Sequence, residues 1–535
     1  MTRPAGPGAR GSGGPNPFPG FRPGAGQGTP ERAAGPGVAP EAGPGSGVRP
    51  GAVAGPAAAV RPRTVDEVAA LVREARRVVP RGGGTKAGSW PVPPGAPPSD
   101  RDGPEGPGSG DPRAAATSAG DDVLMLDTTG LEGIVEYDPA EFTVTARAGT
   151  RVADLEALLA RHGQYLPFDP LRTGAGATLG GTVAMGVSGA CRLRFGGVRD
   201  FVLGVTFVDG EGRVIRGGGR VVKNAAGYDL PKFLCGSMGR FGILAELTFK
   251  VFPRPEAFAT VVFPFPSLDR AAAALEAVYR SPLEPHALEL AGPGVGEGLA
   301  RQGLLARDLA GQGHLGPDPV GRGQVSCMPA PQGPMPQETA RQGYLLLVRV
   351  GGPAAILPAW ADRVIRRVRE ALGMAVPAEV LGGEAEGALW RALSELAWVP
   401  GGPDRPGGAA GAWTGGDSVR APRAPAPLSG GVLLRLYSRP SLLAELDALL
   451  DGHGALRLHS QAATAAWAFF PDEPAWDRLL PALQALGVPA LQWQGPGPLP
   501  GGFVVPPAGT AVARALKQVF DPRGRFLPLP WADGA

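Results

Sequence analysis

The sequence predicts an α+β fold in two parts, and three observations lead to this prediction. Short alternating runs of apolar and polar residues occupy 123–150, and amphipathic helical patterns lie on either side of them at 64–77 and 153–163. After residue 256, strand-like and helix-like runs follow one another towards the end of the chain. We expect these later runs to form an antiparallel sheet covered on one face by helices. The boundary between the two parts is expected near residue 254.

The first helix is predicted over 64–77, TVDEVAALVREARR. Its apolar residues, among them Val65, Val68 and Val72, fall on one helical face, and Thr64 is placed to cap the N-terminus. A short strand, VVPR, then leads into a glycine-rich turn.

The remaining elements of the first part are strands and one more helix. Residues 123–150 predict three short strands, and 153–163 predicts a helix that ends at Gly163. The run FVLGVTFVDGEGRVI predicts two strands joined across Asp209-Gly210 by a two-residue hairpin turn.

The second part predicts six strands, with four helices between them. We expect the tail 513–526, ARALKQVFDPRGRF, to return to the first part. The predicted strands are 259–265, 286–292, 344–352, 431–438, 463–471 and 490–495, and the predicted helices are 268–281, 356–372, 441–453 and 476–487.

Glycine and proline are unevenly distributed. They make up 85 and 61 of the 535 residues and are concentrated in segments that lack apolar periodicity. We therefore expect a disordered tail at 1–58, a first domain over 59–254 with a low-complexity insert at 89–120, and a second domain over 255–535. Two loops, at about 310–340 and 401–428, are expected within the second domain.

Charge and hydropathy exclude several classes of protein. The net charge is +3 without a sustained basic patch, so no nucleic acid partner is expected. The N-terminus lacks the apolar core of a signal peptide, and no run of eighteen apolar residues occurs. The sequence therefore predicts a cytoplasmic protein.

The cysteines and histidines predict no metal centre. Cys191, Cys235 and Cys327 lack the C-x-x-C spacing of iron–sulfur and zinc sites, and we expect two buried thiols and one loop thiol. The five histidines show no paired spacing. His453 and His459 are expected to be surface or helix-end residues.

Three glycine-rich loops in the first part predict a binding site. RGGGTK at 81–86 follows a strand, and its backbone N–H groups could form a nest for an anion such as a pyrophosphate. In the second loop, 174–200, glycines alternate with small residues, which would let the backbone lie against a flat ligand. The third, LCGSMGRFGIL, covers 234–244. Each loop alone is equally compatible with an ordinary turn, and the arginines of the second loop, Arg192, Arg194 and Arg199, with solvated charges.

The order of these motifs resembles a known family. RGGGTK, LDTTGLEGIVEYDPAEFTVTARAGT, GATLGGTVAMGVSG, RFGGVRDFVLGVTFVDGEGRVI and GYDLPKFLCGSMGRFGILAELTFKV occur in the order of the FAD-binding domain of the vanillyl-alcohol-oxidase (PCMH) type. KNAAGYDL and the tail FDPRGRF are most similar to the FAD-binding E subunits of bacterial glycolate oxidases. The resemblance covers about 60–254 and the remainder only in outline. It implies two α+β subdomains that bind FAD, followed by a cap or substrate domain.

The resemblance also implies which residues bind FAD. The first loop would hold the pyrophosphate, the second the ribityl and adenylate path, and the third the adenine side. In the family pattern GGRVVKNAAGYDL, residues 218–230, crosses the cofactor site, and Tyr228 and Asp229 help to form its wall. The alternative is that Asp229 caps the helix that follows. The implied cofactor-binding residues are Arg81, Gly82, Gly83, Gly84, Thr85, Gly176, Thr178, Leu179, Gly180, Ser188, Gly189, Tyr228, Asp229, Gly239, Gly242 and Ile243.

The chain also departs from the family pattern. It lacks the C-terminal histidine cluster that holds a metal and the substrate carboxylate, and it lacks the histidine that attaches FAD, so non-covalent binding is expected. In the family an Asn-Pro-Gly-Arg-like turn usually follows FDP, whereas this chain ends in FDPRGRFLPLP. The resemblance therefore does not support a role for this tail beside the flavin. Arg349 and Arg435 are candidate carboxylate-binding residues, although strand arginines more often face solvent.

Together these features imply a function. The resemblance implies the FAD-binding subunit of a 2-hydroxy-acid dehydrogenase complex of the glycolate oxidase type, which passes electrons to an iron–sulfur subunit and works with a second flavoprotein subunit. Such a chain would be at most peripheral at the inner membrane, through the complex. Two alternatives are a non-catalytic FAD-binding subunit that supports a partner flavoprotein, and a stand-alone FAD-linked oxidase.

Overall fold

The computed structural model describes six stretches of the chain, and four predicted low-complexity segments lie outside them. The predicted tail, the insert and both predicted loops fall in the residues that are not described. The described residues are 59–85, 123–219, 228–305, 343–400, 431–495 and 510–529.

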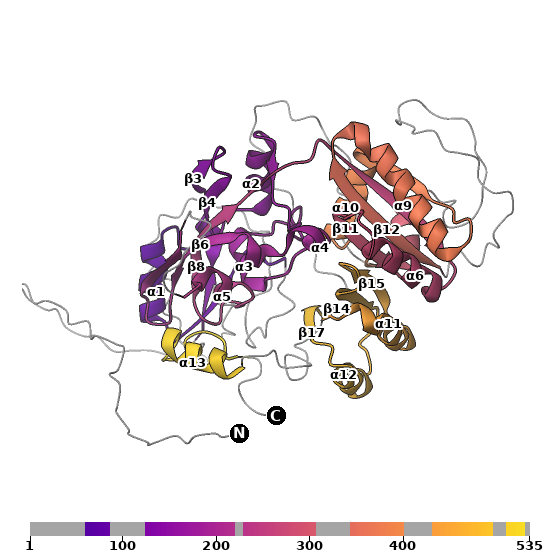
Figure 1. The fold of residues 1–535 in the computed structure, drawn as a ribbon. Helices are drawn as coiled ribbons and strands as arrows, with labels where there is room; N and C mark the ends of the chain where they lie inside the picture. Colours follow the sequence, from indigo (N-terminus) through magenta and orange to yellow (C-terminus); the bar gives the residue numbers. More distant parts are fainter. Residues whose placement is uncertain are drawn as a thin grey trace, which may run out of the picture. The chain divides into compact units, whose positions relative to one another are not determined.

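The first part is built on a five-stranded sheet of order β3-β4-β8-β6-β7 (Figure 1). All its strand pairs are antiparallel. Beside it, β1 (Arg77–Arg81) pairs in parallel with β2 (Val123–Asp127). The strands of the sheet are β3 (Ile134–Asp138), β4 (Thr143–Arg147), β6 (Val202–Val208), β7 (Val214–Gly218) and β8 (Ile243–Lys250).

Helices pack against this sheet as the periodicity predicts. Helix α1 (Val65–Glu74) begins after Thr64, whose side chain accepts a hydrogen bond from the backbone N–H of Glu67. This confirms the predicted cap. The other helices of the first part are α2 (Val152–Ala160), α3 (Leu179–Met185), α4 (Arg192–Phe195) and α5 (Leu230–Leu234), and a small pair of strands, β5 (Gln164–Tyr165) and β9 (Phe252–Pro253), closes it.

The predicted two-residue hairpin turn is wrong. Strands β6 and β7 are joined by five residues, 209–213. The buried carboxylate of Asp209 accepts hydrogen bonds from the backbone N–H groups of Glu211 and Arg213 and from the Arg213 guanidinium. These bonds stabilise the longer loop, because the Asp209 side chain accepts from backbone N–H groups that have no strand partner there.

The second part is an eight-stranded sheet of order β13-β10-β12-β11-β15-β16-β14-β17, antiparallel throughout as predicted. The six predicted strands are present, and β13 and β15 are additional. The strands are β10 (Ala257–Phe265), β11 (Ala287–Ala291), β12 (Tyr344–Gly352), β13 (Glu379–Gly382), β14 (Val432–Tyr437), β15 (Leu456–Ser460), β16 (Ala465–Phe470) and β17 (Ala490–Gln494).

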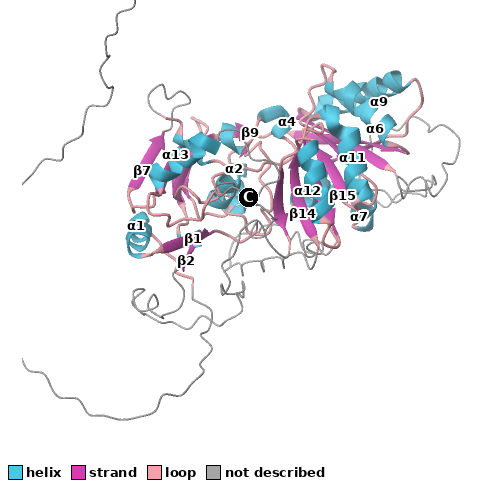
Figure 2. Cartoon of the chain, turned by 90° about the horizontal axis from the view of Figure 1, so that it is seen from below, coloured by secondary structure: helices cyan, strands magenta, loops and turns pink. Residues whose placement is uncertain are grey.

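Helices lie on both faces of this sheet, whereas the sequence predicted one covered face. The outer face packs against the four predicted helices, α6 (Leu268–Tyr279), α9 (Leu357–Leu372), α11 (Leu443–Gly452) and α12 (Trp476–Ala485) (Figures 1 and 2). The inner face packs against two helices that were not predicted, α7 (Val295–Arg301) and α10 (Gly383–Ser394).

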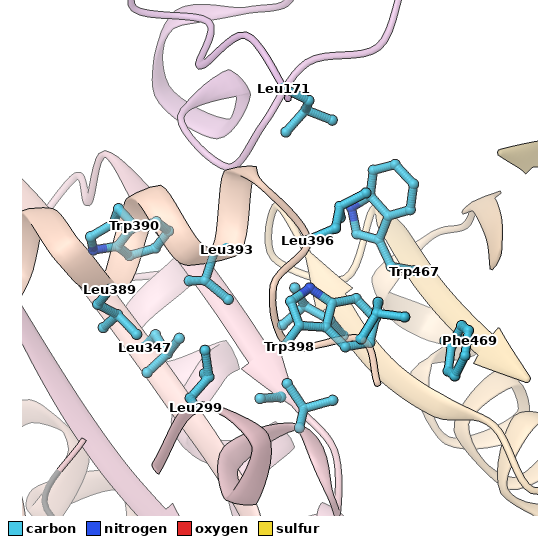
Figure 3. Close-up of a cluster of buried hydrophobic side chains, with 14 of the residues drawn as sticks. Leu171, Leu299, Leu347, Leu389, Trp390, Leu393, Leu396, Trp398, Trp467 and Phe469 are labelled. Carbon is cyan, nitrogen blue, oxygen red and sulfur yellow. The ribbon is translucent and has the colours of Figure 1, made fainter. Parts of the chain in front are cut away.

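The inner face also packs against the first part of the chain. Leu171, Met185 and Met238 belong to the same apolar cluster as Trp467 and Trp398. Figure 3 shows Leu171 above Leu396, with Trp467 beside it. The six described stretches belong to one compact unit. The domain boundary at 254 falls between β8 and β10 and stays a prediction.

The C-terminal segment returns to the first part, as predicted. Helix α13 (Thr510–Phe520) packs Phe520 against Phe207 and Phe233. After it, the Arg525 guanidinium donates hydrogen bonds to the carbonyl oxygens of Val72 and Arg73 at the end of α1.

Candidate functional site

The first glycine loop leaves β1 at Arg81. The hydroxyl of Thr128 donates a hydrogen bond of 3.1 Å to the carbonyl oxygen of Arg81, which fixes the end of the strand. Gly84 has a φ of 71°, a left-handed conformation that glycine adopts without strain. The backbone N–H groups of Gly83 and Gly84 have no acceptor among the described residues, and Thr85 ends this stretch. Such free donors are what a pyrophosphate requires.

The second glycine loop lies directly against the first. A Cβ added to Gly83 would overlap the carbonyl oxygen of Gly176, and one added to Gly82 would lie 2.5 Å from the hydroxyl oxygen of Thr178. Both contacts can be made only because these residues lack side chains. The structure thus brings together two loops that are about ninety residues apart in the sequence.

Helix α3 begins in the second loop. The Thr178 hydroxyl accepts a hydrogen bond from the N–H of Gly181 and so caps the helix. Gly180 faces Ala148, where a Cβ would lie 2.9 Å from the alanine Cβ, and Leu179 is buried in the core. Leu179 therefore has a packing role, while the N-terminus of α3 points to the junction of the two loops.

Ser188 and Gly189 lie further along and contact the second sheet. The Ser188 hydroxyl accepts a hydrogen bond of 2.8 Å from the N–H of Val198. The carbonyl oxygens of Ser188 and Gly189 both accept hydrogen bonds from the side-chain amide of Gln461, in the turn between β15 and β16. This segment thus connects the predicted cofactor loops to the second part.

The third glycine loop packs on α3. The N–H groups of Gly236 and Met238 donate to the carbonyl oxygens of Val183 and Ala184. Gly239 adopts a φ of 67°, the left-handed region.

The last two predicted residues of this loop are packed inside the first part. A Cβ on Gly242 would lie 2.6 Å from the ring of Phe207, and Ile243 is buried beside α1. Both residues support the sheet, and their contribution to the adenine side stays a prediction.

Tyr228 and Asp229 lie at the start of α5, while 220–227 are outside the described residues. Tyr228 is 90% exposed. Asp229 caps α5, accepting a hydrogen bond of 3.1 Å from the N–H of Lys232 and one of 2.6 Å from its ammonium group. The capping interpretation is therefore confirmed, and a role of these two residues in the wall of the cofactor site stays a prediction.

A pocket of about 500 Å³ lies between the second and third loops. Met185 and Gly186 from the second loop and Ser237 from the third line it, and the Ser237 hydroxyl is buried with no hydrogen-bond partner in the described part of the chain. Tyr437 on β14 and Leu491 on β17 line it from the second sheet. The other lining residues are Arg192, Gly197, Val198, Arg199, Asp200, Cys235, Gly236, Met238, Arg240, Phe241 and Leu529.

The chemistry of this pocket fits an anionic ligand with a flat ring system. Arg192 and Arg199 contribute positive charge, whereas Arg194 forms an ion pair of 2.8 Å with Glu284 away from it. The backbones of Gly186 and Gly236 lie so close that a Cβ on Gly186 would be 2.9 Å from the Gly236 backbone. Small residues and cations are what a flavin and its phosphates need in a wall.

Arg349 lies mostly inside the protein, with 11% of its side chain exposed, so the expectation of a solvent-facing strand residue is wrong. Its guanidinium forms an ion pair of 2.7 Å with Glu386, which is itself buried. It also lies 4.2 Å from the Phe258 ring centroid and 4.9 Å from that of Trp390. Because Glu386 already neutralises this guanidinium, Arg349 is poorly suited to hold a substrate carboxylate.

Arg435 is also buried, at 1% exposure, but no carboxylate of the described residues forms an ion pair with it. In the described residues, its Nε and Nη1 atoms donate no hydrogen bond. The guanidinium carbon lies 4.6 Å from the centroid of the Trp467 ring. Burial lowers the pKa of Arg435 to about 10, so the group remains a cation at neutral pH. Of the two predicted arginines, only Arg435 has unused donors.

The two histidines beside the second sheet differ from each other. His453 follows the C-terminus of α11, as expected. His459 is 1% exposed and hydrogen-bonds Asp447 at 2.8 Å, so its prediction as a surface or helix-end residue is wrong. Asp447 also accepts hydrogen bonds from Arg457 and Tyr344, which hold its carboxylate in place. Burial of His459 is favourable because its ring nitrogen is hydrogen-bonded to this carboxylate.

The thiols differ in burial. Cys191 is buried, Cys235 is partly buried, and Cys327 lies outside the described residues. Among the residues of the six described stretches, no group of three His, Cys, Asp or Glu side chains could hold a metal ion. In the same stretches no helix is long and apolar enough to cross a membrane.

The comparison with known families agrees with the second glycine loop. Residues 108–218 match the family described as FAD binding domain. The chain carries an FAD binding domain. The matched region includes the second glycine loop, α3 and the strands β6 and β7, and the resemblance drawn from the order of the motifs is thereby confirmed.

Curated proteins are similar to part of the chain. Glycolate oxidase subunit GlcE of Escherichia coli is 49% identical over 132 residues, 25% of this chain and 38% of that protein. Glycolate oxidase subunit GlcD of Bacillus subtilis is 31% identical over 182 residues, covering 34% and 38%. The D-lactate dehydrogenase of Archaeoglobus fulgidus is 33% identical over 155 residues, covering 29% and 34%. The chain spans about a third of the length of these relatives.

Solved structures are similar over more of the chain. An alkyldihydroxyacetonephosphate synthase, in two crystal forms, aligns with 87% of this chain at TM-scores of 0.52 and 0.54 and 16% identity. At this identity the likeness concerns the fold alone. It extends beyond the FAD binding domain, in agreement with an α+β fold in which a second sheet follows that domain.

The sequence did not reveal several residues that the structure brings to this region. Tyr437 and Ser237 line the pocket, and Gln461 binds the second loop from the opposite sheet. Glu289 on β11, whose carboxylate accepts a hydrogen bond from the N–H of Gln461, carried a signal in the sequence, because it is a charge within the otherwise apolar strand run ALELA.

Proposed function

We propose that this chain is the FAD-binding subunit of a dehydrogenase complex that oxidises a small 2-hydroxy acid, as glycolate or lactate enzymes do. FAD bound in this domain would accept two electrons from the substrate. The names of the related proteins, which are glycolate oxidase subunits and a D-lactate dehydrogenase, support this substrate class. A second flavoprotein subunit and an iron–sulfur subunit are the proposed partners.

The residues of this chain would act by binding and orienting. Gly83 and Gly84 would hold the pyrophosphate through their backbone N–H groups. Arg192 and Arg199 would add positive charge at the pocket, while Tyr437 and Leu491 would exclude water from the side of the second sheet.

The choice of an acidic substrate rests on Arg435. Arg435 is a buried cation with unused donors on the inner face of the second sheet, two residues before the pocket-lining Tyr437. A buried, unpaired charge is costly, and a substrate carboxylate would offset that cost.

The first test is the cofactor. The purified full-length chain should be yellow and should release FAD into the supernatant after acid or heat denaturation. Flavin that stays attached to the precipitated chain would contradict non-covalent binding. A colourless protein that takes up no FAD on titration would contradict the proposed function itself.

The second test is the reaction. Anaerobic addition of glycolate or D-lactate should bleach the flavin slowly in the isolated chain and quickly when candidate partner subunits are co-purified. An FAD-loaded protein that no small 2-hydroxy acid reduces, with or without partners, would point to a non-catalytic subunit. Rapid reoxidation by oxygen without partners would point instead to a stand-alone oxidase.

A further inference from the structure

A charged group of opposite sign accompanies Arg435 on the inner face of the second sheet. Glu289, on β11, is 3% exposed. One of its carboxylate oxygens accepts hydrogen bonds of 2.9 Å from the Ser460 hydroxyl and 2.8 Å from the N–H of Gln461. The other oxygen accepts none from the described residues.

The strand register relates Glu289 to the pocket. Ser460, hydrogen-bonded to Glu289, pairs with Ala465, and Ala465 pairs with Tyr437. Glu289, Ser460, Ala465 and Tyr437 therefore form one row across β11, β15, β16 and β14. Three strand spacings separate the ends of this row, roughly 14 Å. The two middle residues have short side chains, and Tyr437 lines the pocket.

Arg435 reaches into the space beside this row. It lies two residues before Tyr437, on the same face of β14, and its guanidinium carbon is 4.6 Å from the ring of Trp467 on the neighbouring β16. The side chain thus packs against the inner face of β16, the same face of the sheet on which Glu289 lies. Figure 3 shows the Trp467 indole on this inner face.

The two charges influence each other without forming an ion pair. The field of Arg435 lowers the pKa of Glu289, and Glu289 raises that of Arg435, although in both cases the larger effect of burial acts in the opposite direction. Among the described residues, neither has an ion-pair partner within 4 Å. Each keeps atoms without a hydrogen-bond partner among the described residues, Nε and Nη1 of Arg435 and one carboxylate oxygen of Glu289.

The second glycine loop of the FAD binding domain is hydrogen-bonded to the residue that follows Ser460. Gln461, next to Ser460, donates its side-chain hydrogen bonds to the carbonyl oxygens of Ser188 and Gly189. A ligand between Arg435 and Glu289 would therefore face the second glycine loop of the FAD binding domain.

We propose that Arg435 holds the carboxylate of the 2-hydroxy acid and that Glu289 accepts the proton of its hydroxyl group. This assignment rests on the proposed function. In the reaction the C2–H bond breaks, and bound FAD would supply the acceptor for its hydrogen and electron pair, as hydride. The O–H bond breaks and its proton passes to Glu289, and the C2–O bond becomes the carbonyl of the 2-oxo acid.

The protonation behaviour of Glu289 is consistent with this role. Burial raises its pKa to about 7, against the hydrogen bonds from Gln461 and Ser460 and the field of Arg435, while the charge of Asp169 acts in the same direction as burial. A carboxylate that titrates near neutral pH can both take up and release a proton during turnover.

Binding of oxalate, a dicarboxylate that cannot be oxidised by hydride loss, tests the role of Arg435. In the FAD-loaded full-length chain, oxalate should perturb the flavin spectrum, and Arg435→Met should weaken its affinity at least 30-fold while FAD stays bound. Arg435→Lys keeps the charge and should lose less affinity. Arg194→Met, at the surface ion pair with Glu284, is the matched control and should change nothing.

Glu289→Gln tests the proton acceptor by separating binding from chemistry. Oxalate affinity should stay the same or rise, because a negative charge has been removed, whereas reduction of the flavin by glycolate should slow at least 100-fold. If Arg435→Met does not fold, two measurements still test the proposal. They are the oxalate affinity of Arg435→Lys and the difference in Glu289→Gln between oxalate affinity and the rate of flavin reduction.

The outcomes that would overturn the proposal differ from those that would overturn the proposed function. Unchanged oxalate affinity in Arg435→Met, or in Arg435→Lys if the methionine variant does not fold, excludes the carboxylate role. Unchanged reduction in Glu289→Gln, or an equal loss of binding and rate, excludes the proton acceptor. A wild-type holoprotein that no 2-hydroxy acid reduces would instead contradict the proposed function.

Discussion

The side-chain amide of Gln461 donates a hydrogen bond of 3.0 Å to the carbonyl oxygen of Gly189. Gln461 also begins a turn of three residues, with Ala462 and Ala463, whose φ angles of 57°, 55° and 62° are all left-handed. Such conformations cost roughly 1–3 kcal/mol each for non-glycine residues. A strained turn of the second sheet is thus fixed to the second glycine loop of the FAD binding domain.

Replacement of Gln461 should separate the effect of this link from that of the strain. Gln461→Ala removes the hydrogen bonds to Ser188 and Gly189 and should weaken FAD binding about 5- to 10-fold, as measured by fluorescence titration. Gln461→Asn is also too short to reach Gly189 but tolerates the left-handed region better. It should lose FAD affinity equally yet melt at a higher temperature than Gln461→Ala. Wild-type FAD affinity in both variants would exclude a role for the link.

Gly83→Ala should disrupt the junction of the first two glycine loops. The added methyl would overlap the carbonyl oxygen of Gly176, so the loops must separate and their N–H groups must move. We expect at least a 10-fold loss of FAD affinity. Gly452→Ala is the control, because no atom lies within 4 Å of its added Cβ, and its FAD content should equal that of the wild type. Full FAD occupancy in Gly83→Ala would remove this loop from the site.

Arg525→Met should release the C-terminal segment from the first part. The guanidinium loses its hydrogen bonds to the carbonyl oxygens of Val72 and Arg73, which should cost about 2–3 kcal/mol in the free energy of unfolding. Because Leu529, four residues on, lines the pocket, FAD should also dissociate faster. Arg523→Met, on an exposed neighbour, serves as the control. Equal unfolding midpoints for the two variants would contradict this role.

Asp447→Asn should destabilise the protein mainly above pH 4. Burial alone would raise the pKa of Asp447, but hydrogen bonds from His459 and Arg457 outweigh it and hold the pKa well below its ordinary value. The stabilisation is therefore present above the unfolded pKa of about 4 and is lost as the pH falls towards the folded value. We expect a loss of about 3–5 kcal/mol at pH 7 and a smaller difference at pH 3, by chemical denaturation. A pH-independent difference would contradict the charge interaction.

Glu289→Gln should change stability with the opposite pH dependence. Burial raises the pKa of Glu289 to about 7, above its unfolded value. Its stabilising contribution is therefore complete below about pH 4.5 and is lost as the pH rises through 7. The difference in unfolding free energy between Glu289→Gln and wild type should shift in favour of the variant between pH 5 and pH 8.5. A constant difference over this range would show that the carboxylate is already ionised at pH 5.

Local patterns were sufficient for the features that depend on neighbouring residues. The helix over Val65–Glu74 and its Thr64 cap follow from amphipathic periodicity and a nearby hydroxyl. The three glycine loops were recognisable because backbone freedom and motif order are properties of the sequence itself. They indicated an FAD binding domain before any contact between the loops was known.

Contacts across the sheets required the tertiary structure. Strand β15, LRLHS, escaped prediction because Arg457 and His459 interrupt its apolar pattern, and only the pairing with Asp447 makes their burial favourable. The difference between Arg349 and Arg435 likewise depends on Glu386, which reaches one guanidinium and not the other.

The sequence by itself determined which residues could form helices, strands and glycine loops, because those choices are made within a few residues. The tertiary structure alone decided that Gly83 meets Gly176 and that Glu289 shares a row with Tyr437. Strand order and loop docking set these distances, and they join residues between about ninety and a hundred and fifty positions apart. The energy of a buried charge depends on such neighbours, so the candidate site became visible only in the folded chain.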